Sequence, residues 1–319
     1  MVKRKTQMIR NKENSKSKFC GIIGTAYCGS TMLSYILGSS EDIFSTGELN
    51  KGFPRYKCAH AWHNGDWTKG RECRFWTEDF AKDLKENTLR GRNKKLKAQA
   101  QRAFGKKIVF NADKGAETYR RSIDQGDDVD CVIVLFKKPQ AFAYSHEAHL
   151  RNRSKKNRIQ LLDQACNRYY SQYNNGILIL KKYRIPHIFV QYEDLAENTE
   201  KEIKRICRFL NAKYSKDMIP FWNNKSKLHM SPSGNRGAHR QFLKKESFLK
   251  TWTSHLDPQF GDQAYHTEHA KWFLANYHKI TLDEKWRKYL SEEEVKHIAS
   301  KHKKTMNIYK KMVKRIGNG

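Results

Sequence analysis

The sequence predicts an α/β fold in which helices cover both faces of a central parallel β-sheet, giving three layers, α/β/α. Three observations support this prediction. Short apolar segments of strand length alternate with longer amphipathic segments along the chain. The segment VDCVIVLF at residues 129–136 is apolar throughout, which is typical of a strand buried on both faces. A glycine-bounded loop at residues 24–29 joins the first apolar segment to a helical one.

The predicted elements begin after a basic leader, residues 1–18, that we expect to be disordered. Short apolar runs predict strands at 19–24, 107–112, 129–136 and 187–192. Composition and apolar spacing predict helices at 30–40, 78–107, 139–158, 161–183 and 199–210. A last helix begins at the capping box of Ser291 and Glu294 and continues to Met312. Residues 19–319 thus form one domain, in which the aromatic-rich residues 241–279 are expected to be an insertion or a lid.

Charge limits the classes of function. Lys and Arg number 63 and Asp and Glu number 33, so the net charge is +30. Such a charge attracts polyanions, for example nucleic acid, acidic glycans or multiply phosphorylated small molecules. The basic runs at 89–97 and 151–158 fit either a polyanion-binding surface or solvated helix faces. No nucleic-acid-binding motif accompanies them, so we expect no dedicated nucleic-acid partner.

The cellular location is predicted from what the sequence lacks. No apolar segment reaches the roughly 20 residues needed to span a bilayer, and the N-terminus has no secretory signal. The seven cysteines are scattered and do not form a disulfide pattern. We therefore expect a soluble, cytoplasmic protein, or a lumenal one if an N-terminal anchor has been removed.

Residues 24–31, GTAYCGST, have the spacing of a phosphate-binding loop, G-x-x-x-x-G-x-T. Glycines allow backbone amides to point at an oxyanion, and the helix that follows adds its N-terminal N–H groups. Ser30 or Thr31 can cap the first turn of that helix. Ser30 stands where the Walker sequence has lysine, so the loop predicts anion binding without ordinary ATP hydrolysis. A plain strand-to-helix turn is the alternative.

Segments in the same order resemble the sulfotransferases that use 3′-phosphoadenosine 5′-phosphosulfate (PAPS), most closely a bacterial-type branch, and are also similar to tyrosylprotein and carbohydrate sulfotransferases. They are GTAYCGSTMLSYILGSSEDIFSTGEL, ECRFW, VIVLFKKPQAFAYS, YEDLAENTEKEIKRICRFLN, HMSPSGNRG and LDEKW. The resemblance implies a P-loop-like fold and in-line transfer of a sulfuryl group from PAPS to a hydroxyl group. The product would be adenosine 3′,5′-bisphosphate, and no metal would be needed.

The resemblance also implies which residues bind the donor. The loop residues would hold its 5′ end: Thr25, Ala26, Tyr27, Cys28, Gly29, Ser30 and Thr31. Lys137 and Ser145 would hold the 3′-phosphate, and Gly234, Asn235 and Arg236 would close over the nucleotide. The family often has Arg or Lys at the position of Tyr27. It usually has Arg at that of Lys137, so Lys137 keeps the charge but loses the bidentate fork.

Two residues are predicted to be catalytic. Glu48, in the G-E dipeptide, is the candidate general base; the alternative is a carboxylate that fixes a loop. Lys114, in NADKG, resembles the lysine that neutralises the leaving oxygen; the alternative is a surface lysine. We expect Asp113 to orient Lys114.

Three questions remain open in the sequence. Zinc binding by Cys58, His60, His63 and Cys73 fits the residue types but no standard spacing, and a Cys58–Cys73 contact or disulfide is an alternative. The acceptor is a hydroxyl-bearing glycan, peptide or small molecule, and the net charge favours an acidic one. The alternative functions are a degenerate P-loop kinase or NTPase and a non-catalytic polyanion-binding protein.

Overall fold

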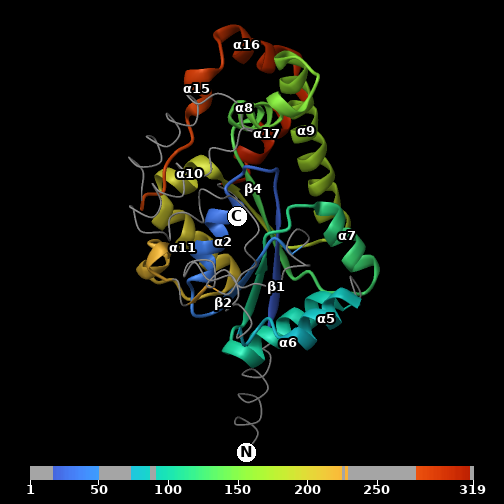
Figure 1. The fold of residues 1–319 in the computed structure, drawn as a ribbon, viewed down its shortest axis with the longest axis vertical. Helices are drawn as coiled ribbons and strands as arrows, with labels where there is room; N and C mark the ends of the chain where they lie inside the picture. The colour runs from blue at the N-terminus through green and yellow to red at the C-terminus, as the bar shows by residue number, and fades with distance from the viewer. Residues whose placement is uncertain (1–16, 50–72, 87–90, 225–226, 229–277, 317–319) are drawn as a thin grey trace, which may run out of the picture.

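The structure is a computed structural model and describes residues 17–49, 73–86, 91–224, 227–228 and 278–316 (Figure 1). The predicted leader lies outside the described residues except for residues 17 and 18, and Lys18 already belongs to the first strand. The predicted insertion lies outside them except for residues 278 and 279. None of the described helices combines the length and the apolarity needed to cross a membrane.

A parallel sheet forms the centre of the described fold, with the strand order β2-β3-β1-β4-β5. The strands are β1 Lys18–Ile23, β2 Ile43–Gly47, β3 Ile108–Asn111, β4 Cys131–Phe136 and β5 His187–Gln191. The predicted α/β fold with a central parallel sheet is therefore confirmed. Strand β2 was not predicted, because its sequence IFSTG has only two large apolar residues and forms an edge of the sheet.

Helices precede or follow nearly every strand. They are α2 Ser30–Gly38, α5 Glu78–Glu86, α6 Arg92–Phe104, α7 Ala116–Asp124, α8 Pro139–Leu150, α9 Arg158–Lys182, α10 Tyr192–Glu197, α11 Thr199–Leu210, α15 Lys285–Tyr289, α16 Glu292–Lys301 and α17 Lys303–Val313. Short 3-10 helices lie at Arg151–Arg153, Lys216–Met218 and Phe221–Asn223. Figure 1 shows α2, α10 and α11 on one side of the sheet and α7 and α9 on the other.

Two predicted helices are interrupted in the structure. The helix predicted at 78–107 is α5 followed by α6, and Gly91 before α6 has a positive φ of 70°, which a regular helix excludes. At the C-terminus, His302 separates α16 from α17. The capping box predicted for α16 is confirmed, because Glu294 N donates to Ser291 Oγ (3.1 Å) and Ser291 N donates to Glu294 Oε2 (2.8 Å). The short helix α7 was not predicted.

The side chains of β4 alternate between two apolar cores, one on each face of the sheet. Val132, Val134 and Phe136 belong to the core that includes residues of α8 and α9. Cys131, Ile133 and Leu135 belong to the core that includes residues of α2 and α11. Because both cores are buried, the apolar run of β4 is covered on both faces, as predicted.

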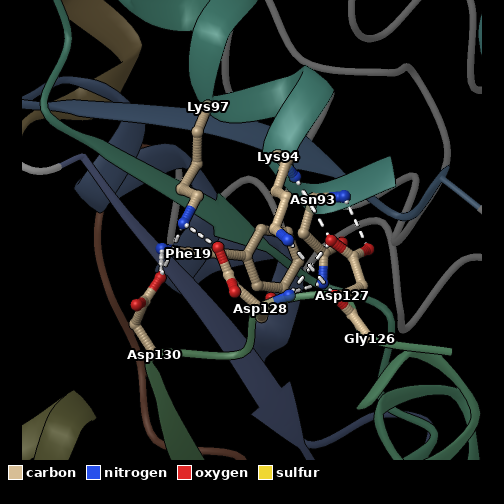
Figure 2. A network of polar contacts seen from close by, with 8 residues as sticks. All are labelled: Phe19, Asn93, Lys94, Lys97, Gly126, Asp127, Asp128 and Asp130. Atoms are coloured by element: carbon tan, nitrogen blue, oxygen red, sulfur yellow. Dashed lines mark hydrogen bonds and ion pairs between the residues drawn. The ribbon is translucent and has the colours of Figure 1, made fainter. Parts of the chain in front are cut away.

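The first basic run, predicted at 89–97, is partly structural. The side chain of Lys97, in α6, is buried, and its Nζ contacts Asp128 Oδ2 (3.0 Å) and Asp130 Oδ2 (3.2 Å). Figure 2 shows these contacts beneath α6. The carboxylate of Asp130 also accepts the backbone N–H of Phe19 (2.7 Å). This lysine therefore joins α6 to the loop that enters β4 and does not belong to an open polyanion-binding surface.

Candidate functional site

Four predicted site features lie just beyond the carboxyl ends of parallel strands. The glycine-bounded loop follows β1, Glu48 follows β2, Lys114 follows β3 and Lys137 follows β4. The carboxyl ends of parallel strands meet at one edge of the sheet, where ligands bind in open α/β folds. The fold therefore collects at this edge residues that are distant in the sequence.

The loop between β1 and α2 requires both of its glycines. A Cβ atom added at Gly24 would lie 2.8 Å from Cys28 Sγ and 2.8 Å from Leu135 O. Gly29 has a φ of 91°, and an added Cβ would lie 2.4 Å from Cδ2 of Tyr192. The backbone of the loop therefore packs directly against β4 and against the Tyr192 ring.

The N-terminus of α2 is not capped by a side chain. The predicted cap, Ser30 or Thr31, is wrong: Gly29 is the N-cap residue, and it has no side chain to accept a hydrogen bond. Ser30 and Thr31 are instead buried in the first turn. Because the first N–H groups of a helix have no acceptor within the helix, this end is suited to an anion.

The backbone of Thr25 is held by a tyrosine of α9. Thr25 N donates to the Tyr173 hydroxyl (3.2 Å), which itself donates to Leu135 O (2.9 Å). The hydroxyls of Thr25 and Tyr173 are 3.4 Å apart. The structure therefore gives Thr25 a role in anchoring the loop to β4, which the sequence did not predict.

Three other loop residues differ in exposure. Ala26 is half-buried, whereas Tyr27 is exposed, has a positive φ of 62° and packs its ring on His149 (5.8 Å between centroids). The part of the Tyr27 side chain that is shielded from water raises the pKa of its hydroxyl, against the opposite effect of Arg168 and Arg153, so the hydroxyl is neutral at pH 7. Burial likewise raises the pKa of the Cys28 thiol, which faces the core.

The two predicted catalytic residues form an ion pair. Lys114 Nζ donates to Glu48 Oε1, and the two side chains are only 13% and 8% exposed. The sequence predicted a base and a cation at this edge but not their direct contact. A proton acceptor and a cation therefore meet at one point, largely shielded from water.

Local backbone geometry positions this pair. Gly47 has a φ of 66° at a bulge at the end of β2, and its carbonyl accepts Ala112 N (3.0 Å). The carbonyl of Lys114 accepts the N–H of Gly24 (3.3 Å), which ties the residue to the loop. Asp113, expected to orient Lys114, exchanges hydrogen bonds with Asn111 (3.0 and 3.3 Å).

Lys137 is a buried lysine at the end of β4. It is 1% exposed, and its Nζ lies 3.5 Å from Ser145 Oγ, as the motif predicted, and 2.9 Å from Asp283 Oδ2. Its ammonium group also lies 5.6 Å from the centroid of the Tyr192 ring. The contact with Asp283 was not predicted, although LDEKW, which contains this residue, was among the segments that carry the resemblance.

Tyr192 connects the two parts of the site. Its ring lies against Gly29 at the start of α2 and also faces the Lys137 ammonium group. Its hydroxyl donates to Thr281 O (2.8 Å). Sequence reasoning missed this residue, although the resemblance included its segment, YEDL, because nothing in the motif indicates which way an aromatic ring points.

Some predicted residues lie outside the described part of the chain. They are Gly234, Asn235 and Arg236 of the late loop, and Cys58, His60 and His63 of the possible zinc site. Cys73 is buried and packs in an apolar core.

Within the described residues, one group of side chains has the types and spacing to hold a metal ion: Asp163, His297 and His302. Asp163 Oδ1 lies 2.7 Å from Nε2 of each histidine, and Oδ2 lies 2.7 Å from Lys301 Nζ. Burial raises the pKa of Asp163, but Lys301 and the two histidines outweigh burial and hold the pKa below its usual range. We interpret the group as an ion-pair network that joins the C-terminal helices to α9.

Two arginines of the second basic run, predicted at 151–158, are paired with carboxylates of this chain. Arg151 makes two hydrogen bonds of 2.8 Å to the buried carboxylate of Glu147. Arg158 pairs with Glu294 (2.7 Å) and donates to the carbonyl of Tyr289 (2.5 Å). These arginines therefore support α8 and α16 and are not simply solvated charges.

Comparison with known proteins relates part of the chain to one family. The sulfotransferase domain family model matches residues 131–273, which include Lys137 and Ser145. No curated protein matches the chain.

Among solved structures, the sulfotransferase domain from the Synechococcus PCC 7002 olefin synthase superposes with a TM-score of 0.50 at 17% identity, covering 94% of this chain and 96% of that one. The sulfotransferase domain from the curacin biosynthetic pathway gives 0.44 at 14% identity, covering 82% and 99%. Mouse sulfotransferase SULT7A1 complexed with PAP gives 0.45 at 10% identity, covering 88% and 82%. Only the first of these supports the fold. Residues 131–273 thus match the sulfotransferase domain family, and the chain has the sulfotransferase fold that its sequence predicted.

Proposed function

We propose that the protein transfers a sulfuryl group from PAPS to a hydroxyl group of an acceptor. The observation that carries the proposal is the position of Lys137, whose ammonium group lies near Ser145 and faces the same Tyr192 ring that packs on Gly29. Two features suited to binding an anion, a helix N-terminus and a buried lysine, therefore lie against the same Tyr192 ring. A nucleotide with phosphates at both the 5′ and the 3′ position needs two such features, whereas ATP has no 3′-phosphate.

The donor-binding roles follow from this arrangement. The N-terminus of α2, with Ser30 and Thr31 in its first turn, would hold the 5′ end of the donor. Lys137 and Ser145 would hold the 3′-phosphate through a charged and a neutral hydrogen bond. Gly234–Arg236 remain the proposed closing loop. PAPS supplies the sulfuryl group and the phosphate oxygen from which it departs.

The ion pair of Glu48 and Lys114 would carry the chemistry. Glu48 accepts the proton of the acceptor hydroxyl, whose oxygen forms a bond to sulfur while the bond from sulfur to the 5′-phosphate oxygen breaks. Lys114 turns from Glu48 toward that phosphate oxygen and compensates its new negative charge. Since Glu48 then loses its cationic partner, its proton affinity rises at the step in which it takes a proton. Lysines and helix N–H groups supply the charge, so the proposal requires no metal.

The proposed acceptor is a hydroxyl-bearing glycan, peptide or small molecule. The net charge of +30 favours an acidic acceptor. The net charge already counts the carboxylates that pair with cations of the two basic runs, such as those that contact Lys97 and Arg151.

Calorimetric titration of the whole chain with three nucleotides tests the proposal. We expect adenosine 3′,5′-bisphosphate to bind at least about tenfold more tightly than 5′-AMP, because one charged hydrogen bond contributes about 1.5–3 kcal/mol. ATP with Mg²⁺ is the third ligand. Preferential binding of ATP with Mg²⁺ would favour a kinase or NTPase, and binding of none of the three would contradict a nucleotide site.

A further inference from the structure

A carboxylate of this chain contacts Lys137, the lysine that is proposed to bind the 3′-phosphate. Asp283 Oδ2 lies 2.9 Å from Lys137 Nζ, closer than Ser145 Oγ at 3.5 Å. Lys137 is 1% exposed and the side chain of Asp283 is 23% exposed, so the contact is largely shielded from solvent. An anion is therefore already bound to the lysine that the donor would need.

A second lysine flanks the same carboxylate. Lys285 follows Asp283 by two residues, at the start of α15, and is half-buried. Burial lowers the pKa of Lys285, the Asp283 carboxylate acts in the opposite direction, and Lys137 adds to the lowering. Burial raises the pKa of Asp283, but Lys137 and Lys285 outweigh it and hold the pKa below its usual range. Lys137 therefore contacts the Asp283 carboxylate directly, and Lys285, two residues along the chain, acts on the same carboxylate through its charge.

The segment that carries Asp283 is held in place on both sides. Before it, the carbonyl of Thr281 accepts the hydroxyl of Tyr192 (2.8 Å). After it, Tyr289 stacks on Tyr144 of α8, with 5.5 Å between ring centroids and 4° between planes. Tyr192 also packs on Gly29, so the segment is linked to the start of α2.

We propose that Lys137 and Lys285 together form the 3′-phosphate subsite, and that Asp283 fills it until a dianionic phosphate takes its place. This inference rests on the proposed function. With Asp283 in place, the two lysines and one carboxylate leave a net charge of +1; with Asp283 displaced, a phosphate dianion balances both lysines. A singly charged anion that displaced Asp283 would balance only one of the two lysines. Asp283 thereby selects against singly charged anions.

The test compares adenosine 3′,5′-bisphosphate with 5′-AMP by calorimetry on the wild type, Asp283→Asn and Lys285→Ala. Asp283→Asn keeps the side-chain shape but removes the competing charge, so it should bind the bisphosphate about tenfold more tightly. Lys285→Ala should bind it about tenfold more weakly. Neither variant should change the affinity for 5′-AMP. Glu284→Gln is the matched control, because Glu284 is exposed and pairs only with Arg287 among the contacts that the structure shows for its side chain.

The outcomes separate this inference from the proposed function. If the wild type prefers the bisphosphate but Asp283→Asn binds it no more tightly, Asp283 is not a competitor and the inference is wrong. If Lys285→Ala leaves the bisphosphate affinity unchanged, Lys285 serves only to balance Asp283, and the two-lysine subsite is wrong. If no variant prefers the bisphosphate to 5′-AMP, the proposed function itself fails. Thermal unfolding of each variant without ligand confirms that all are folded.

Discussion

The two ends of the parallel sheet both bury a lysine against an aspartate, but the aspartates are held differently. At the amino end, Lys97 contacts Asp130, whose carboxylate also accepts the backbone N–H of Phe19 (2.7 Å; Figure 2). At the carboxyl end, Lys137 contacts Asp283, which comes from a segment far later in the chain. The first aspartate is fixed by the strand that begins the fold, whereas the second lies outside the sheet and its entry loops.

This difference separates a structural cation from the one that is proposed to bind a ligand. Displacing Asp130 would break a hydrogen bond at the start of β1, so an external anion cannot easily replace it. The neighbouring Asp127 is fixed in the same way, because it accepts the N–H of Asn93 (2.8 Å) at the start of α6. At the carboxyl end, Lys114 and Lys137 instead point to single carboxylates near the loop, as a site for an exchanging anion requires.

The largest expected effect belongs to Lys114, the lysine paired with Glu48. Lys114→Met should lower the rate of labelled sulfuryl transfer from PAPS by about a thousandfold with any acceptor that the wild type labels, because the leaving oxygen loses its cation. The double variant Lys114→Met/Glu48→Gln removes the unpaired buried carboxylate. Recovery of stability without recovery of rate would show that the pair of Glu48 and Lys114 is needed for the reaction and not only for folding; recovery of both would contradict a catalytic role for either residue.

Removing the cation at the amino end should affect stability alone. Lys97→Met should lower the free energy of unfolding in urea by about 2 kcal/mol, less than for a fully buried pair because its partners Asp128 and Asp130 are 36% and 29% exposed. The affinity for adenosine 3′,5′-bisphosphate should not change. Unchanged stability with weakened nucleotide binding would show that the two ends are not distinct.

A smaller effect is expected where α9 supports the loop. Tyr173→Phe removes the hydroxyl that bonds Thr25 N and Leu135 O, and should lower the free energy of unfolding by about 1 kcal/mol. The control is Tyr183→Phe, whose exposed hydroxyl contacts Asp124 and should contribute little. Equal stability of the two variants would argue that the loop does not depend on Tyr173.

The smallest effect is expected for Asp163, whose ion-pair network lies at neither end of the sheet. The pKa of Asp163 is depressed in the folded state, so its contribution to stability is present at neutral pH and is lost as the pH falls below about 4, the usual range of an aspartate. The difference in Tm between the wild type and Asp163→Asn should therefore shrink on acidification. A difference that stays constant with pH would mean that the network contributes through packing and not through charge.

The sequence predicted the parts of this molecule whose signals are local. The apolar run of β4 and the capping box of α16 are each contained in a few residues, and both were placed correctly. Strand β2 was missed because buried serine and threonine replace the usual apolar residues. Gly29 as the cap of α2 was also missed, because a positive φ is not visible in a motif.

The sequence predicted which residues belong to the candidate site but not which of them contact one another. Glu48 and Lys114 were given separate roles, and only the fold shows that they are paired. The partner of Lys137 comes from a segment that no local rule connects to β4, since their contact depends on how α15 packs against α8. Periodicity and spacing cannot reveal such a contact between residues far apart in the chain.

The central claim, that the carboxyl end of the sheet binds a 3′-phosphate through Lys137, is tested most directly by one calorimetric cycle. The ratio of affinities for adenosine 3′,5′-bisphosphate and 5′-AMP is measured for the wild type, Lys137→Ala and Lys97→Met. We predict that the ratio falls by at least about tenfold in Lys137→Ala and is unchanged in Lys97→Met. A ratio that survives in Lys137→Ala would contradict the claim, because the 3′-phosphate would then be bound elsewhere.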